Sequence, residues 1–283
     1  MIVDLHTHSS ESDGSLSPAQ LVRRAAARGV GVLALTDHDT TAGVAEAQRV
    51  AAQLGVRLLP GVEISTDWEG TTLHVIGLNI DAANRALQAG LAHTREGRME
   101  RARAISRSLA KAGIDGALAG AMRQAGEVSS VSSLGRMHFA RFLVALGCAR
   151  TASGVFDHYM TKGKPGHVEH RWAPLDEVLA WIKGAGGQAV LAHPWRYGLR
   201  AGDQARLARA LHDLGGDALE LAPDDRRGRR ARHHASMACP QGLNCSLGSD
   251  FHVPGEGHDL GIPGSRTSLA WAGIEGGSSD CSA

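Results

Sequence analysis

The sequence predicts an α/β protein whose strands run parallel in a covered sheet or barrel, with a helical segment inserted in the middle of the chain. Short apolar runs alternate with helix-patterned segments near both ends of the chain, as in strand–helix–strand units with parallel strands. Between residues 89 and 172 this alternation gives way to a helical pattern rich in arginine and alanine. We therefore expect residues 1–88 and 173–283 to form the α/β core, and residues 89–172 to form an inserted cap or lid.

Local signals mark the individual elements. Ile2–Leu5 is expected to be a strand, and Ser17 with Pro18 marks a helix start, because serine caps helices and proline suits their first position. Further strands are expected at Val30–Leu35, Val56–Leu59, Val62–Ile64, Leu73–Ile80, Gln188–Ala192, Ala218–Leu221 and Leu243–Leu247. Further helices are expected from Thr40 or Thr41 to Leu54, from 84 to 121, from Ser133 to Gly147 and from Pro174 to Ile182.

Composition excludes several classes of protein. The 283 residues are 43% hydrophobic and 21% charged, which is ordinary for a globular chain and argues against bulk disorder. A net charge of +1 argues against a strongly basic, polyanion-binding protein. The four cysteines form no C-x-x-C pair, and no secretory leader or membrane span is recognisable. We expect a cytoplasmic protein with no membrane association and no obligate protein partner.

Metal-ligand side chains follow one predicted strand after another. The candidate ligands are His6, His8, Asp13, His38, Glu63, His74, His193, Asp250 and His252. Each of them alone has an ordinary explanation, such as a helix N-cap for an aspartate or a loop position for a histidine. Because active sites of α/β folds lie at the carboxyl ends of the strands, so many ligands at one rim favour a metal site.

The composition of this ligand set indicates the metals and the substrate. Six imidazoles and three carboxylates exceed what one tetrahedral zinc requires and suit two or three divalent ions, of which manganese fits best, with iron or zinc as alternatives. Three such ions outweigh three carboxylates by about three charges, which favours a phosphate dianion over a neutral amide. Clustered divalent ions also generate hydroxide near neutral pH, and we assign no side chain as nucleophile or general acid.

Six motifs in order along the chain resemble the polymerase and histidinol phosphatase (PHP) family of metal-dependent phosphoesterases. They are 4–9 with Asp13-Gly14, 36–39, 61–64, 73–75, Ala192-His193-Pro194 and 248–252. The resemblance implies a distorted (β/α)7 barrel with a trinuclear metal site. It further implies one ion at His6, His8, Glu63 and Asp250, a second at Glu63, His74 and His193, and a third completed by Asp13, His38 and His252.

Within that family the helical insertion is similar to the nucleoside 3′,5′-bisphosphate phosphatase branch. The motifs concerned are 133–141, 163–166 and 193–197. This likeness implies removal of the 3′-phosphate from nucleoside 3′,5′-bisphosphates by a metal-activated hydroxide, and some relatives trim short RNA from its 5′ end. The partners implied are therefore a nucleotide and short RNA 5′ ends. Arg136, His138, Lys164 and Arg196 are the candidate substrate-binding residues, since a second phosphate needs cations beyond the metals.

Three alternatives stay open from the sequence. A different phosphomonoesterase, such as a histidinol phosphatase, would share the metals without a second-phosphate clamp. A metal-dependent amidohydrolase also opens with His-x-His, although no strand-end lysine for its usual metal bridge is present. The third alternative is an inactive metal-binding PHP module. Separately, the basic run 226–234 is either an exposed helix face or an electrostatic guide for nucleotide or RNA ends.

Overall fold

A computed structural model describes residues 1–126, 133–223, 229–263 and 269–274 of the chain. Eight strands in these residues form one sheet in the order β7-β6-β5-β4-β3-β2-β1-β8. Their bounds are β1 Ile2–Asp4, β2 Val30–Leu35, β3 Arg57–Trp68, β4 Thr71–Leu78, β5 Gln188–Leu191, β6 Ala218–Leu221, β7 Asn244–Leu247 and β8 Ile262–Pro263. At the far side the backbone N–H of Leu5 donates to the carbonyl of Leu247 at 2.9 Å, so the ends of β1 and β7 meet. The predicted distorted barrel is thereby confirmed.

The expectation of purely parallel strands is wrong at two places. β4 pairs antiparallel with both β3 and β5, and β8 pairs antiparallel with β1. The reason lies in the turn between β3 and β4, where Glu69 and Gly70 both have positive φ, at 49° and 78°. Two successive residues of positive φ form the tight turn that joins antiparallel neighbours, which leaves no room for a crossover helix.

β3 is one long strand where two short ones were expected. Pro60 and Gly61 suggest a break in the sequence, yet Pro60 stays in register with Leu35 of β2 and Gly61 with Leu78 of β4. The resulting 12-residue strand runs past the rest of the barrel. The β3–β4 hairpin therefore carries its middle residues, as well as its ends, toward the site described below.

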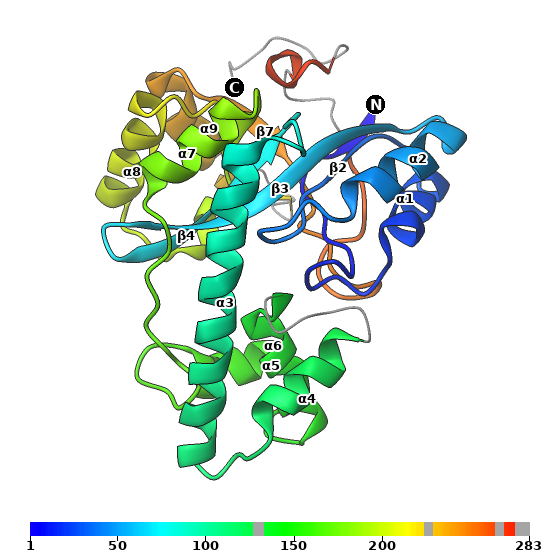
Figure 1. Cartoon of the computed structure of the whole chain (residues 1–283). Coiled ribbons are helices and arrows are strands. Elements are labelled where there is room, and N and C mark those ends of the chain that lie inside the picture. The colour runs from blue at the N-terminus through cyan, green and yellow to red at the C-terminus, as the bar shows by residue number, and fades with distance from the viewer. Residues whose placement is uncertain (127–132, 224–228, 264–268, 275–283) are drawn as a thin grey trace.

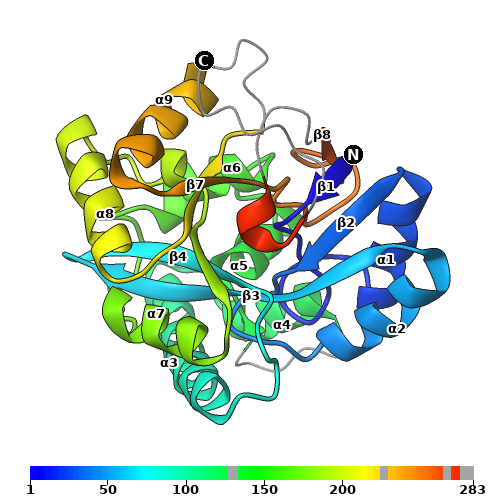
Figure 2. The same cartoon turned by 90° about the horizontal axis from the view of Figure 1, so that it is seen from above.

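Helices cover the barrel on two sides, as Figure 1 and the view from above in Figure 2 show. α1 (Pro18–Ala27) and α2 (Val44–Leu54) lie on one side, and α7 (Leu175–Gly184), α8 (Ala201–Asp213) and α9 (Arg229–Ala238) lie on the other. The predicted Ser17 cap of α1 is confirmed as a capping box with Gln20. The predicted threonine cap of α2 is wrong, because that helix follows Gly43 without a side-chain cap.

A cap of helices stands below the barrel in Figure 1. The long helix α3 (Arg85–Lys111) leaves the barrel and carries α4 (Ala117–Ala125), α5 (Arg136–Ala145), α6 (Ala152–Val155) and the π-helical turn η2 (Phe156–Met160). These helices share a hydrophobic cluster of their own, separate from the two clusters of the barrel. The expected boundary at residue 89 falls inside α3. This helix therefore runs without interruption from the barrel into the cap. None of the helices described combines the length and apolar character needed to cross a bilayer.

Glycine substitutions test the packing of the cap. A Cβ at Gly120 in α4 would lie 2.1 Å from the ring of Phe142 in α5, whereas a Cβ at Gly202 in α8 meets nothing within 4 Å. We expect Gly120→Ala to lower the free energy of unfolding by about 1–3 kcal/mol through overpacking. Gly202→Ala, the matched control, should leave it unchanged or raise it by up to about 1 kcal/mol. Urea titration measures both, and equal effects would contradict this packing.

Candidate metal centre

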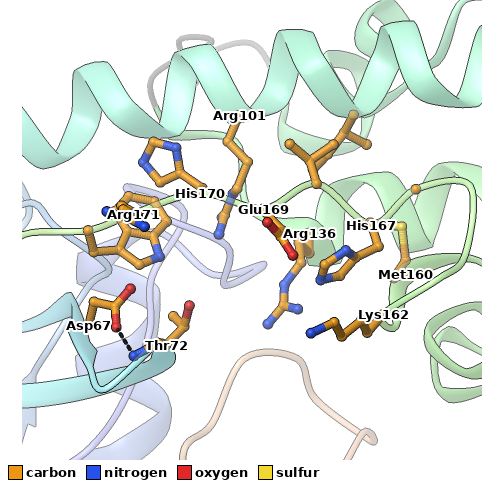
Figure 3. Close-up of a pocket in the computed structure, with 15 residues that line it drawn as sticks. Asp67, Thr72, Arg101, Arg136, Met160, Lys162, His167, Glu169, His170 and Arg171 are labelled. Atoms are coloured by element: carbon orange, nitrogen blue, oxygen red, sulfur yellow. Dashed lines mark hydrogen bonds between the residues drawn. The ribbon is translucent and has the colours of Figure 1, made fainter.

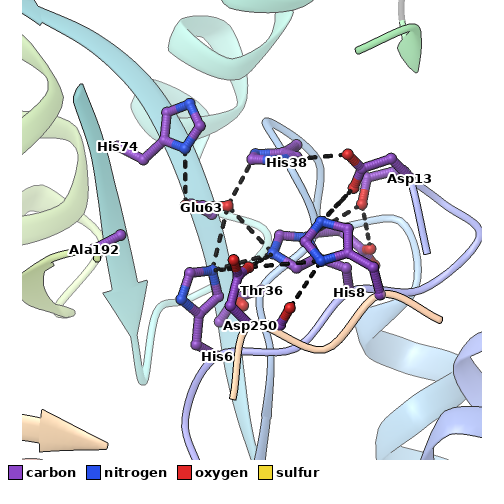
Figure 4. A network of polar contacts seen from close by, with 12 residues as sticks. His6, His8, Asp13, Thr36, His38, Glu63, His74, Ala192 and Asp250 are labelled. Atoms are coloured by element: carbon purple, nitrogen blue, oxygen red, sulfur yellow. Dashed lines mark hydrogen bonds and ion pairs between the residues drawn. The ribbon is translucent and has the colours of Figure 1, made fainter. Parts of the chain in front are cut away.

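Every sequence-predicted ligand comes to one region at the end of the barrel. Figure 4 shows this region and labels all of them except His193 and His252. His6 and His8 follow β1, and His38 follows β2. The other positions are Asp13 in the loop after β1, Glu63 within β3, His74 within β4, His193 after β5, and Asp250 and His252 after β7. Glu63 and His74 therefore lie in the middle of a hairpin rather than at strand ends, because β3 and β4 are long and antiparallel.

Glu63 lies at the centre of the cluster. Its Oε1 is 3.0 Å from His74 Nδ1 and 2.9 Å from His193 Nε2. Its Oε2 is 3.3 Å from both His6 Nε2 and His8 Nε2 and 3.0 Å from His38 Nδ1. Five imidazoles thus face the two oxygens of one fully buried carboxylate.

The ligand atoms fall into three overlapping groups in which all atoms lie within 4.8 Å of one another. The groups are His6, His8, Glu63 and Asp250; His38, Glu63 and His74; and His8, Asp13, His38 and His252. The first coincides with one set that the family resemblance implies. The other two groups differ from the implied sets: His38 stands with Glu63 and His74, His8 is shared between two groups, and His193 belongs to none of the three. The division of residues among ions therefore stays a prediction.

Unsatisfied polar atoms in this cluster fit divalent cations. Among the described residues, Asp13 Oδ1, His38 Nδ1, Glu63 Oε2 and His193 Nδ1 are buried without a hydrogen bond. Buried polar atoms are nearly always paired, so four orphans in one cluster require an explanation. Three of them lie in the groups just described, where cations between imidazole nitrogens and carboxylate oxygens would satisfy them.

The carboxylates of the cluster are held ionised. Burial alone would raise the pKa of Glu63, but the imidazoles of His38 and His6 outweigh it and hold that pKa well below its usual range. The pKa values of Asp13 and Asp250 are likewise lowered against burial, mainly by His252 and His6 respectively. Anionic oxygens among imidazoles are the donors that divalent manganese, iron and zinc prefer.

Two buried aspartates that are not candidate ligands fix the loops that carry ligands. The carboxylate of Asp37 accepts hydrogen bonds from the backbone N–H of Ser9 at 2.7 Å and from the hydroxyls of Ser9 and Ser12 at 2.6 and 2.7 Å. Asp4 accepts from the N–H and hydroxyl of Ser249 at 2.9 and 2.7 Å. These bonds fasten the segments before Asp13 and Asp250.

A third buried aspartate joins the metal-ligand loops to the cap. Asp39 has positive φ, at 53°, and its N–H donates to the carbonyl of Glu63 at 2.8 Å. Its carboxylate accepts from the N–H of Ser65 at 2.8 Å and pairs with the buried guanidinium of Arg98 in α3. The middle of α3 is therefore tied to the loop that carries His38 and to β3, which carries Glu63.

Glu220 on β6 orients two candidate ligands at once. Its carboxylate accepts from His6 Nδ1 at 3.0 Å, which leaves His6 Nε2 facing Glu63 and Asp250. The other oxygen accepts the N–H of His193 at 2.7 Å and so supports the strained backbone of that residue, whose φ is 28°. Carboxylates behind metal-binding histidines orient the ring and raise its basicity.

A cavity of about 480 Å³ opens directly beside this cluster. Arg136 and Arg196, two of the predicted substrate-binding residues, line it. Arg136 lies over the ring of Phe156 at 5.6 Å, and Arg196 is paired with Asp250. No lysine is among the described residues that line this cavity, so the lysine bridge of an amidohydrolase has no counterpart here.

The other two predicted substrate-binding residues do not line this cavity. His138 is 1% exposed and accepts the N–H of Gly135 with Nδ1 at 3.0 Å at the start of α5, and burial lowers its pKa to about 4. Lys164 is exposed and does not line the cavity, whereas Lys162 lines a second cavity next to it. His138 thus has a structural partner that explains its burial.

Sequence reasoning missed Arg98 and Arg101 on α3. Both guanidinium groups lie over the ring of Trp172, at 5.7 and 4.7 Å, and both side chains line the cavity. Their spacing of three residues places them on one helix face. The sequence offers no other sign that these two arginines line a cavity. α3 carries several more arginines, among them Arg95 and Arg103, and the sequence alone does not distinguish them from Arg98 and Arg101.

The basic run 226–234 lies only partly in the described residues, since 224–228 fall outside them. The part that is described forms the first half of α9. His234 is 2% exposed and stacks near Trp195 at 5.7 Å, and His233 bonds to Gln204 of α8 at 3.0 Å. These two histidines therefore have partners in the fold, and the role of the run as a whole stays a prediction.

Comparison with protein families identifies the class to which this site belongs. Residues 4–182 match the PHP domain, which is more than half of the chain. The chain therefore belongs to the PHP family, as its motifs predicted. The clustered His, Asp and Glu side chains fit the divalent metals on which phosphoesterases of this family depend.

Individual relatives cover nearly the whole chain. It is 47% identical to the 3′,5′-nucleoside bisphosphate phosphatase of Chromobacterium violaceum, over 92% of this chain and 90% of that protein. It is 43% identical to the 5′-3′ exoribonuclease Rnm of Salmonella typhimurium, over 98% and 92%. The predicted likeness to the bisphosphate phosphatase branch is thereby confirmed.

Solved structures agree with the fold. A sulfate-bound, metal-free structure of an amidohydrolase from Chromobacterium violaceum matches with a TM-score of 0.86 and 47% identity over 91% of each chain. A metal-dependent phosphoesterase from Bifidobacterium adolescentis matches with a TM-score of 0.81 and 30% identity over 95% of this chain and 93% of its own. Both support the fold described above.

Removing Glu220 should weaken metal binding without unfolding the protein. We expect Glu220→Ala to lower the affinity for Mn²⁺ by about 10- to 100-fold, because His6 and His193 lose their orienting partner. Glu220→Gln should lose less, since an acceptor oxygen remains. Titration calorimetry measures the affinity, and Glu69→Gln on the exposed hairpin turn is the control. An unchanged affinity in Glu220→Ala would show that Glu220 does not orient ligands.

Proposed function

We propose that this chain is a metal-dependent phosphatase that removes the 3′-phosphate of nucleoside 3′,5′-bisphosphates and leaves the nucleoside 5′-monophosphate. The observation that carries the proposal is that Arg101 and Arg136, which form no ion pair in the described part of the chain, line the same cavity as seven of the nine candidate metal ligands. A substrate with two phosphates needs two anion sites. The metals supply one of them, and the arginines supply the other.

His6, His8, Asp13, His38, Glu63, His74, His193, Asp250 and His252 would hold two or three divalent ions, with manganese as our first choice and iron or zinc as alternatives. When bound, such ions neutralise phosphate oxygens and make water nucleophilic near neutral pH. The protein keeps the three carboxylates of the cluster ionised. Glu220 orients His6 and supports His193, and the carboxylates of Asp37, Asp4 and Asp39 fasten the segments that carry other ligands. Arg196, now paired with Asp250, lies within reach of a phosphate bound beside that carboxylate.

Arg101 and Arg136 are suited to hold the phosphate that is not cleaved. In the described part of the chain neither of them has a carboxylate partner, and each lies against an aromatic ring that limits its motion. Burial, together with the nearby charges of Arg98 and Arg136, lowers the pKa of Arg101. An anion bound here would relieve this repulsion, and a guanidinium group binds phosphate through two parallel hydrogen bonds.

The remaining walls of the cavity suit a nucleoside. Met137, Phe156 and Tyr197 offer apolar and aromatic surface between the ligands and the arginines. The hydroxyl of Tyr197 is occupied, since it accepts the N–H of His74 at 2.9 Å and donates to the carbonyl of Ala192 at 2.8 Å. Tyr197 therefore presents its ring while its hydroxyl supports the strand of His74. We further propose that residues 89–172 act as the cap that closes this cavity.

A second candidate activity uses the same groups. In RNA the phosphate on the 3′ oxygen of the first nucleotide is a diester, and its hydrolysis releases a nucleoside 5′-monophosphate from the 5′ end. The chain's 43% identity to an exoribonuclease supports this alternative. Short RNA with a 5′-phosphate would place that phosphate on Arg101 and Arg136, as a bisphosphate does.

Phosphate release from adenosine 3′,5′-bisphosphate with added Mn²⁺ tests the proposal, against 5′-AMP, 3′-AMP and histidinol phosphate. We expect the bisphosphate to be preferred by at least about tenfold in kcat/KM, because one charge-assisted contact contributes about 1.5–3 kcal/mol. Arg101→Gln should reduce turnover of the bisphosphate by a similar factor and spare 3′-AMP. The exposed Arg103→Gln on the same helix is the matched control.

Other outcomes point to the alternatives. A preference for histidinol phosphate, together with an equal loss of kcat/KM on all substrates in Arg101→Gln, would indicate a general phosphomonoesterase. Arg101 and Arg136 would then not form a dedicated site for a second phosphate. No hydrolysis of any phosphate ester by protein that binds Mn²⁺ would favour an inactive metal-binding module. Chelation should abolish every activity, and activity that survives chelation would contradict a metal-dependent site.

A further inference from the structure

A second cavity lies behind the first and is not needed by a mononucleotide. This rear chamber, lined among others by Asp67, Arg101, Arg136, Lys162, Glu169 and Trp172, has a volume of about 530 Å³. It lies between α3, the segment after η2 and the turn of the β3–β4 hairpin (Figure 3). Arg101, Arg136 and Thr72 line both cavities, so the arginine pair forms the boundary between them.

Volume shows that the rear chamber is additional space. Pockets that take drug-sized ligands measure about 300–1,000 Å³. The front cavity, at about 480 Å³, is large enough for a nucleoside with its two phosphates, and the rear chamber is as large again. A substrate whose second phosphate lies between Arg101 and Arg136 therefore has room for a further group on the other side of that phosphate.

The rear chamber carries the charge that a phosphate-bearing group requires. Arg101, Arg136, Lys162 and Arg171 outnumber the carboxylates of Asp67 and Glu169 there. In the described part of the chain the first three make no ion pair and no hydrogen bond, and Figure 3 shows their side chains reaching into the chamber. Cations that outnumber the carboxylates of a cavity and form no ion pair with them favour an anion in that cavity.

Other groups of the chamber favour a nucleotide over bare phosphates. Trp172 is 6% exposed, lines the chamber, and its Nε1–H has no hydrogen-bond partner among the described residues. One carboxylate oxygen of Asp67 accepts the N–H of Gly70 at 2.9 Å, and the other has no such partner among the described residues. The side chain of Glu169 is exposed at the wall of the rear chamber. An indole donor and carboxylate acceptors match the oxygens, hydroxyls and amines of a ribose and base. A polyphosphate offers the carboxylates nothing but repulsion.

We propose that the rear chamber is a subsite for one further nucleotide, joined through its 3′ oxygen to the phosphate that Arg101 and Arg136 hold. The inference rests on the proposed function and extends its substrate class to dinucleotides with a 3′-phosphate. In the reaction on such a substrate, the bond between phosphorus and the terminal 3′ oxygen breaks and a water oxygen joins the phosphorus. The leaving oxygen takes up a proton, and the products are the dinucleotide and inorganic phosphate.

Turnover of three adenosine substrates tests the subsite on Mn²⁺-loaded protein: pAp, the dinucleotide pApAp, and pppAp with a 5′-triphosphate. We expect kcat/KM for pApAp to equal or exceed that for pAp. Lys162→Gln and Arg171→Gln, both at exposed positions, should lower kcat/KM for pApAp by about tenfold and leave pAp unchanged. Lys111→Gln at the exposed end of α3 is the matched control and should change neither.

Three results would overturn the subsite. The first is slow turnover of pApAp beside fast turnover of pAp. The second is an equal effect of Lys162→Gln on the turnover of both substrates. The third is an effect of Lys162→Gln on pppAp alone, which would assign the chamber to polyphosphate. Calorimetry separates this inference from the proposed function if pAp itself is not hydrolysed. The dinucleotide pApA should still bind more tightly than 5′-AMP, and Lys162→Gln should remove the difference; equal binding of pApA and 5′-AMP would overturn the proposal.

Discussion

The structure depends on one buried carboxylate that faces five imidazoles. Glu63 is fully buried, and nitrogens of His6, His8, His38, His74 and His193 lie within 3.3 Å of its two oxygens. Without cations this cluster leaves buried polar atoms unpaired or brings several protonated histidines together, and both arrangements are costly. Divalent ions held by these nitrogens and oxygens would remove the conflict. Much of the surrounding structure holds these groups in place.

That support reaches α3 through the ion pair of Asp39 with Arg98. Asp39 bonds to the strand of Glu63, and Arg98 is buried in the middle of α3. One turn further along, Arg101 lies on Trp172 and faces both cavities. The metal-ligand segments and Arg101 are therefore fixed by the same helix. A link of this kind would set the distance between the metal ions and the phosphate that we propose Arg101 holds, as a substrate with two phosphates requires.

The barrel and the convergence of the nine candidate ligands could be predicted because both follow simple rules. Strand–helix alternation predicts the architecture, and ligand types placed after successive strands converge when those strands form one rim. The antiparallel β4 was missed because Glu69-Gly70 resembles any turn until both residues adopt positive φ. The length of β3 was missed because Pro60-Gly61 resembles a break.

The substrate side could not be predicted as well, for a physical reason. Metal centres need particular side chains, whereas a phosphate is bound by whichever arginines the tertiary structure brings close to it. Nothing local distinguishes Arg101 from its neighbours on α3, and Lys162, rather than the predicted Lys164, lines the rear chamber. His138 looked like a phosphate ligand in the sequence, but it accepts a backbone hydrogen bond inside the cap.

The central claim is that the cluster around Glu63 holds two or three divalent ions. Anomalous diffraction at the manganese edge, from crystals of the Mn²⁺-loaded protein, tests it most directly. The account predicts two or three peaks among the nine ligands, with Glu63 next to more than one of them. A single ion bound away from Glu63, or no peak in the cluster of a protein that is active in the crystal, would contradict it.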